Sequence, residues 1–180
     1  MKLNVRTPSL RGQRRTERGA GAVEFALLVP LLFVILFGII DYGFWFNDSL
    51  NARQGVREAA RQGVVHNFGT TSSCGASYAQ TPSANLQKLV CKTKAEVGAV
   101  TGPVFVKVHL PGGPTWERGE PLVVCAMVRA DGTTGIAPLP GDGLIKTRTD
   151  LSIEKVVGIT QTEAEGWETD PSGDNWSWCP

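Results

Sequence analysis

The sequence has few of the residues that enzymes commonly use for catalysis. It contains only two histidines, His66 and His109, and neither stands beside a nucleophile motif. No glycine-rich phosphate loop follows a predicted strand, and the isolated acidic residues lack the spacing of a catalytic pair. We therefore expect no enzymatic activity and no bound cofactor.

Cysteine is absent before residue 74, and no Cys-x-x-Cys pair or histidine cluster occurs. This pattern argues against a metal site. All four cysteines follow a long apolar run, and an even number of cysteines in an exported domain is typical of disulfides. Three pairings are compatible with the sequence. We expect Cys74 to pair with Cys91, which would pin a loop to a helix. We expect Cys125 to pair with Cys179, which would tie the C-terminus to a central strand.

Charge is absent from residues 25–40, which read FALLVPLLFVILFGII. With its apolar flanks, this run reaches the roughly 20 residues that a membrane-spanning helix needs. Glu24 and Asp41 lie 17 residues apart, roughly 26 Å along a helix. That separation places both carboxylates near the interfaces of a hydrocarbon layer about 30 Å thick. Residues 20–46 are therefore predicted to form one transmembrane helix, with membrane lipid around it.

The first 19 residues are strongly basic. They carry six basic side chains and one acid, hence a net charge of +5, whereas the whole chain is +1. Because basic flanks stay in the cytoplasm, residues 1–19 are predicted to be a cytoplasmic leader in a single-pass inner-membrane protein. Residues 47–180, on the outer side, carry 12 basic and 14 acidic side chains. That balance argues against a nucleic-acid partner.

Three export routes begin with a basic leader and an apolar run. A secretory signal peptide needs small residues after the apolar core, but here DYGFWFN follows. Twin-arginine export would use Arg14 and Arg15, which are followed by Thr16 and Glu17. The third route cuts before the apolar run, after Gly19, and leaves the helix attached.

The stretch over residues 18–65 resembles the TadE-like family, the pseudopilins of tight-adherence (Flp-type) pili. The matching pieces are RGAGAVEFALLVPLL, GIIDYG and NARQGVREAARQG. The resemblance implies cleavage by a prepilin peptidase after Gly19, before four residues that begin with Ala20 and lead to Glu24 and Phe25. It also implies a minor pilin or pseudopilin that acts in pilus assembly and adhesion. Its partners would be other pilins or pseudopilins and an inner-membrane assembly platform, and incorporation into a pilus would follow.

The residues around the expected cut fit this chemistry. Gly19 has no side chain and tolerates almost any backbone angle, which suits a scissile bond. By resemblance to pilins, Glu24 would neutralise the new amine at Ala20 of a neighbouring subunit, since a lone carboxylate in a low-dielectric bundle needs a partner. The alternative is an interfacial Glu favoured by the helix dipole. Pro30 removes one helical hydrogen bond, and its kink is either static or changes on assembly.

Residues 47–65 are predicted to continue the helix outside the membrane. One face carries small apolar residues and is expected to pack closely on a sheet or helix: Ala52, Val56, Ala59, Ala60 and Gly63. Beside it, Arg53, Arg57 and Arg61 form an i, i+4 ridge. This ridge is either an assembly contact for acids on a neighbouring subunit or a solvated face.

Residues 66–160 predict a small head. The amphipathic pattern of residues 85–97 indicates a helix, and residues 104–110, 122–129 and 144–156 have the patterns of strands. Glycine- and serine-rich loops connect these elements. The fold class is therefore α+β: a long N-terminal helix, half transmembrane and half outside, followed by a pilin-like head with a helix and an antiparallel sheet.

Residues 161–180 are acidic and rich in tryptophan. We expect a flexible tail held by one disulfide, or alternatively a strip that contacts a partner or a sugar. The competing function for the whole chain is an uncleaved single-span membrane protein whose outer head is a binding or adhesion module.

Overall fold

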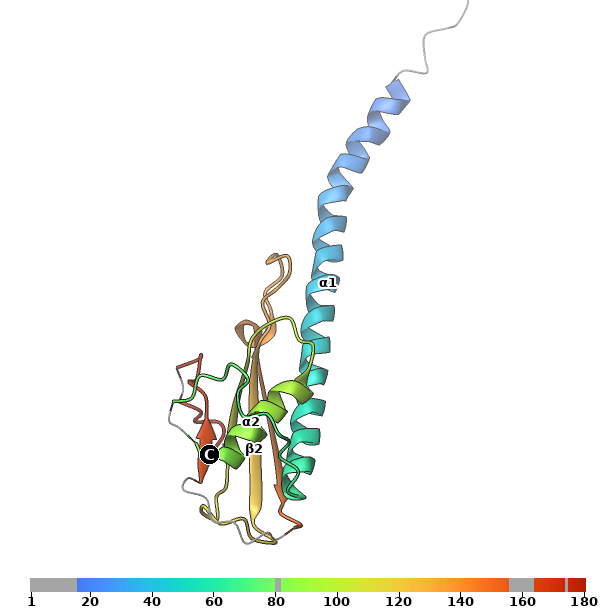
Figure 1. Ribbon diagram of the computed structural model, residues 1–180. Coiled ribbons are helices and arrows are strands. Elements are labelled where there is room, and N and C mark those ends of the chain that lie inside the picture. Colours follow the sequence, from blue (N-terminus) through green and yellow to red (C-terminus); the bar gives the residue numbers. More distant parts are fainter. Residues whose placement is uncertain (1–15, 80–81, 156–163, 174) are drawn as a thin grey trace, which may run out of the picture.

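The computed structural model describes residues 16–79, 82–155, 164–173 and 175–180. Over these residues it has the predicted α+β fold, with two α-helices and a four-stranded antiparallel sheet (Figure 1). The elements in chain order are α1 (Thr16–Val64), α2 (Ala84–Val97), β1 (Val104–His109), β2 (Pro121–Arg129), the short 3-10 helix η1 (Pro140–Gly143), β3 (Leu144–Ser152) and β4 (Glu165–Trp167). Most of the basic leader, and Val156 at the end of the third predicted strand, lie outside the described residues.

Helix α1 runs without interruption through Pro30. Figure 1 shows a long, gently curved helix whose N-terminal half projects beyond the head while its C-terminal half lies along it. Side chains from Gly19 to Ile40 are exposed or half-buried, and the first buried residue is Asp41. The apolar half of α1 thus has no protein core around it within the described residues.

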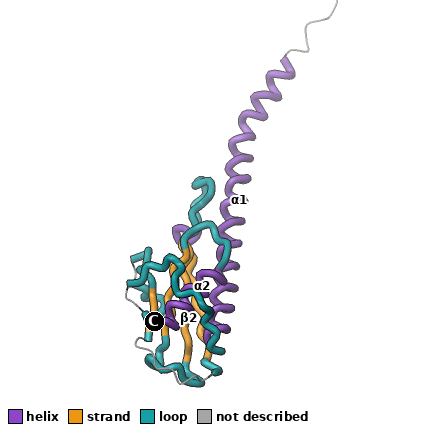
Figure 2. The backbone as a smooth tube through the Cα atoms, in the orientation of Figure 1, coloured by secondary structure: helices purple, strands orange, loops and turns teal. Residues whose placement is uncertain are grey.

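The sheet has the order β3-β2-β1-β4, with all neighbours antiparallel. Strand β2 is central, as its nearly continuous apolar sequence predicts. Helix α1 packs on β2 and β3, and α2 packs on β1 and β4. The tube in Figure 2 shows the strands side by side with α1 along the head.

Both faces of β2 are covered, which explains why its sequence does not alternate. The face toward the helices carries Leu122, Val124, Ala126 and Val128, which belong to the main core. The opposite face carries Val123, Cys125 and Met127, which pack with Trp176 and Cys179 from the C-terminal segment. The C-terminal segment is therefore the third layer of the head.

The expectation of a flexible acidic tail is wrong for the described residues. Strand β4 pairs with β1, and Trp176 is only 2% exposed. The physical reason is the apolar outer face of β2, extended by Phe105 of β1, which needs a cover that the two helices cannot supply because they lie on the other face. A second, smaller difference is that β3 ends at Ser152, and the Ile153 N–H then donates to the carbonyl of Glu120.

Two glycines let α1 approach its neighbours closely. A Cβ built on Gly55 would lie less than 3.0 Å from the backbone of Val97 at the end of α2. A Cβ on Gly63 would lie 2.7 Å from a methyl group of Leu122. The small face predicted for residues 52–63 is therefore required by the close contact of α1 with α2 and β2.

Gly55→Ala should destabilise the head even though alanine favours helices by about 1 kcal/mol. The new methyl group meets backbone, which cannot move aside as a flexible side chain can, and such overpacking typically costs about 1–3 kcal/mol. Gly38→Ala is the matched control, because nothing lies within 4 Å of its Cβ. Thermal unfolding of the full chain in detergent should show a lower Tm for Gly55→Ala only. Equal Tm values for both variants would contradict the tight contact.

Candidate functional site

The N-terminal half of α1 is the first part of the candidate site. Gly19, Ala20, Glu24 and Phe25 occupy its first turns and are all exposed. The helix over Gly19–Val64 is long and apolar enough to cross a membrane; its most apolar window has a mean hydropathy of 2.8 and is entirely unburied. No described residue of the head forms a hydrogen bond or ion pair with Glu24, whose carboxylate is free for an outside partner.

Gly19 lies inside the helix rather than in an extended segment. A peptidase that needs an extended scissile bond would have to unwind the first turn. Gly19 and Gly21 make this inexpensive, because glycine destabilises a helix by roughly 0.5–1 kcal/mol relative to alanine. Neither glycine has a neighbouring side chain that would resist the change.

Asp41 joins α1 to the loop between β2 and β3. Its side chain is only 1% exposed. The Thr134 N–H donates to Oδ1 at 3.0 Å, and the Thr134 hydroxyl donates to Oδ2. The neighbouring Tyr42 hydroxyl donates to the carbonyl of Pro138 at 2.9 Å. These contacts attach the loop at two successive residues of α1.

Asp48 makes the same kind of contact two helical turns later. It is fully buried, and its Oδ2 accepts from the backbone N–H of Thr101 at 3.2 Å and from the Thr101 hydroxyl. Thr101 lies in the loop between α2 and β1. Trp45, between the two aspartates, packs against the main core. The head thus contacts α1 from residue 41 onward.

Sequence reasoning missed both contacts. Asp41 is predicted to be an interfacial carboxylate, and the sequence predicts no contact with the head for Asp48 or Trp45. The available signal was the spacing, because residues 41, 45, 48, 52 and 56 fall on one face of a 3.6-residue helix. An acid on a face that is otherwise buried must be hydrogen-bonded.

The arginine ridge lies on the exposed side of α1. Arg61 pairs with Glu58 at 3.1 Å, and hydrogen bonds from Arg61 and Gln62 hold the pKa of Glu58 below its usual value. In the part of the chain that the structure describes, Arg53 and Arg57 form no ion pair. A groove of about 690 Å³ lies between Arg57, Arg61 and the edge strand β3.

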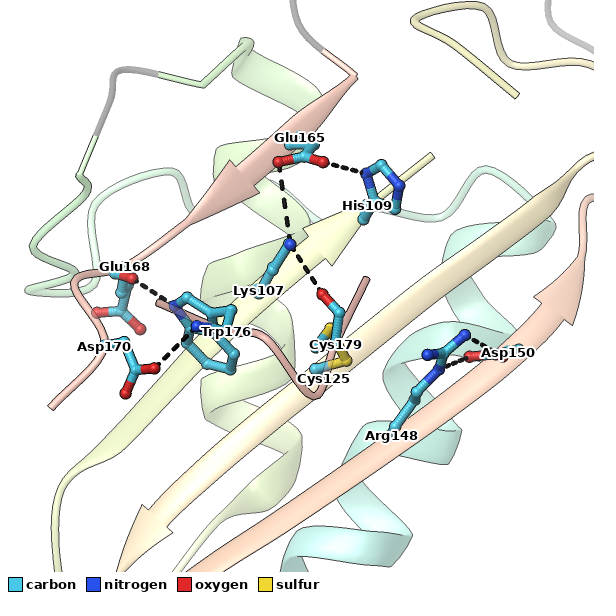
Figure 3. The surroundings of a disulfide bond; sticks show 10 residues. All are labelled: Lys107, His109, Cys125, Arg148, Asp150, Glu165, Glu168, Asp170, Trp176 and Cys179. Atoms are coloured by element: carbon cyan, nitrogen blue, oxygen red, sulfur yellow. Dashed lines mark hydrogen bonds and ion pairs between the residues drawn. A yellow bond between two sulfur atoms is a disulfide. The ribbon is translucent and has the colours of Figure 1, made fainter. Parts of the chain in front are cut away.

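The two disulfides join the pairs expected from the sequence, Cys74–Cys91 and Cys125–Cys179. The second holds the C-terminus on the outer face of the sheet, as Figure 3 shows. Lys107 donates to the carbonyl of Cys179 at 2.8 Å, so a bond from β1 supports the same attachment.

Two acids complete the attachment of the C-terminal segment. Glu168 is 2% exposed, and its carboxylate accepts from the Val106 N–H at 2.9 Å and from Lys94 at 2.7 Å. Burial raises the pKa of Asp170, but hydrogen bonds from Ser172 and Trp176 outweigh it, so this pKa lies below its usual value. Both acids therefore act as structural carboxylates.

The two histidines lie in packed surroundings. His66 packs edge-on against Phe68 and near Trp116, and burial lowers the pKa of the imidazole. His109 Nδ1 lies 2.7 Å from Glu165 Oε1 on the outer face, where burial also lowers the histidine pKa. Across the described ranges, no three residues of the types that bind metals come together.

The family model described as TadE-like protein matches residues 19–61. Residues 19–61 are therefore similar to the TadE-like family. The match begins at Gly19 and lies entirely within α1, so it covers about a quarter of the chain and none of the head. No curated protein and no solved structure matches the chain. The match relates residues 19–61 to a pilus-related family, and it gives no positive sign of catalysis.

Asp48→Ala should loosen the head from the TadE-like helix. It removes a buried carboxylate that accepts two hydrogen bonds from Thr101, and hydrogen bonds to charged groups contribute about 1.5–3 kcal/mol. Asn47→Ala is the control, since Asn47 is the exposed preceding residue. Urea titration followed by tryptophan fluorescence should show a lower midpoint for Asp48→Ala than for Asn47→Ala. Indistinguishable midpoints would show that the contact adds no net stability.

Proposed function

We propose that this protein is a minor pilin or pseudopilin of a tight-adherence (Flp-type) pilus or a related secretion system. The observation that carries the proposal is the TadE-like match that starts at Gly19, combined with a helix whose first half is unburied. A helix of this kind has two environments open to it, lipid before assembly and neighbouring helices afterwards. The head packs on the C-terminal half of α1 and therefore lies outside both the lipid and the bundle of neighbouring helices.

In this proposal residues 1–19 are a cytoplasmic leader that a prepilin peptidase removes. The transmembrane part then begins at Ala20. Because the head contacts α1 from Asp41 onward, the span ends near Ile40 rather than at residue 46. From Ala20 to Ile40 the helix rises roughly 30 Å, which matches the hydrocarbon thickness. The head is extracytoplasmic, and its two disulfides are stable in that oxidising environment.

Assembly contacts are proposed at three places along α1. Glu24 is exposed and free to meet the terminal amine of a neighbouring subunit. Pro30 lies in the unburied half, where a neighbouring helix would have to accommodate its kink. Arg53 and Arg57, with Arg61 beside them, face outward and offer charge to acids on another subunit. The other partners are pilins or pseudopilins and the inner-membrane assembly platform, and adhesion is the proposed outcome.

The alternative is an uncleaved single-span protein whose head is a binding or adhesion module. The helical conformation of Gly19 favours it, because an ordered helix is a poor peptidase substrate. The two candidates differ in the N-terminus of the protein isolated from cells. A mature N-terminus at Ala20 supports the pilin, whereas residues 1–19 kept in cells that contain the peptidase support the alternative.

Gly19→Leu should block processing because a bulky side chain would stand next to the scissile bond. Gly21→Leu is the matched control: it changes the same residue type two positions later, and both glycines have open surroundings. Intact mass spectrometry should find the Gly19→Leu protein with its first 19 residues and the Gly21→Leu protein mostly without them. Normal maturation of Gly19→Leu would refute the cut site.

Glu24→Gln should leave membrane insertion intact and impair piliation. The change removes the charge and keeps the shape of the side chain, so a loss of assembly points to the electrostatic contact. Glu24→Asp, which keeps the charge, should retain more assembly than Glu24→Gln. Membrane fractionation and a count of pili per cell measure the two effects. Normal piliation by Glu24→Gln would remove the proposed role.

A further inference from the structure

The loop over residues 131–143 is the part of the head nearest the N-terminal half of α1. Figure 1 shows it rising beyond the end of the sheet alongside α1, and Figure 2 shows the same projection. Residues 132–141 read GTTGIAPLPG and carry no charge, while Asp131 and Asp142 stand at the two ends. Ile136, near the tip, is 51% exposed. The tip of the loop therefore carries an exposed apolar side chain within ten uncharged residues, and its two acids lie at the base.

Two hydrogen-bonded contacts fix the height of this tip along α1. Thr134 binds the Asp41 carboxylate, and the carbonyl of Pro138 accepts from Tyr42. Ile136 lies between these two anchors in the sequence. The loop therefore cannot swing away from α1 without breaking bonds to a buried carboxylate.

This height coincides with the outer boundary of the apolar run. Glu24 and Asp41 are 17 residues apart, roughly 26 Å, so a helix that spans the bilayer places Asp41 at the outer interface. The exposed apolar residues of α1 include Ile39 and Ile40, directly before the anchors. The loop tip continues this apolar surface at the same level.

We propose that residues 135–139 insert into the headgroup region of the outer lipid leaflet and give the head a second contact with the membrane. The proposal rests on the span proposed above. The absence of charge in residues 132–141 suits an interfacial environment, and the two acids at the base remain in water. A weak contact is sufficient, because α1 already holds the loop beside the lipid.

Site-specific labelling of the full chain in lipid vesicles tests this. All four native cysteines are in disulfides and none is free, so a dye that reacts with thiols labels only an introduced cysteine. Three single variants carry the dye: Ile136→Cys at the loop tip, Leu32→Cys within the span, and Glu117→Cys in the exposed loop between β1 and β2. Vesicles of equal parts phosphatidylcholine and phosphatidylglycerol contain nitroxide-labelled lipids as quenchers, with the nitroxide on the headgroup or deep in the acyl chain.

Headgroup nitroxide should quench the fluorescence of the Ile136→Cys dye at least about twofold more than that of the Glu117→Cys dye. The Leu32→Cys dye should be quenched best by the deep nitroxide. If Leu32→Cys is quenched and Ile136→Cys behaves as Glu117→Cys does, the loop contact is refuted while the span stands. If the Leu32→Cys dye is not quenched, the transmembrane span is refuted, and with it the proposed function on which the loop contact rests. An Ile136→Cys dye that loses water contact only at high protein-to-lipid ratios would show that another subunit covers the loop, which also refutes the lipid contact.

Discussion

In the proposed membrane-bound protein, one helix has to suit both lipid and a protein core. Up to Ile40, α1 presents large apolar side chains on all sides, as lipid requires. From Asp41 onward one face of α1 is buried against the head, although Phe44, Phe46 and Leu50 on its other sides are still exposed. From Ala52 onward that buried face consists of small residues. The change occurs without a break in the helix, so the direction of the span sets the direction of the head. The aspartates at 41 and 48 make this coupling specific, because each fixes a different loop of the head to a defined turn of α1.

The head needs a third layer because the sheet has two apolar faces, and each must be buried against another element. Two helices cover only one face of β1 and β2, and the other face carries Val123, Cys125 and Met127. Leaving that apolar face in water would forgo the free energy gained by burying it. Trp176 and Cys179 cover that face, and the disulfide to Cys125 holds the cover in place. The buried carboxylate of Glu168 accepts the Val106 N–H, a donor on the β1 edge beyond the three residue pairs that join β1 to β4.

The sequence predicted the elements that have a strong local pattern. The helix at residues 85–97 and the strands at 104–110 and 122–129 occur within about a residue of their expected positions. The long helix ends where expected but begins at Thr16, four residues before its expected start at residue 20. The C-terminal segment was misjudged, because β4 has only three residues and its stability comes from tertiary contacts rather than propensity. Asp41 and Asp48 were misjudged for a related reason. Their partners, Thr134 and Thr101, lie far away in the chain, and no local pattern shows that a loop will reach them.

The two acids that flank the apolar run now have different physical roles. Asp41 receives hydrogen bonds from Thr134 of its own head, so its desolvation is already compensated within the chain. Glu24 is exposed and has no such partner among the described residues. In the proposed transmembrane orientation, Glu24 lies close enough to the inner interface to be hydrated. On leaving the lipid for a bundle of helices it would lose that water, and a cation from another chain would compensate the loss and keep the carboxylate charged. Of these two acids, only Glu24 takes part in the proposed assembly contacts, whereas Asp41 keeps the head in register with the helix throughout.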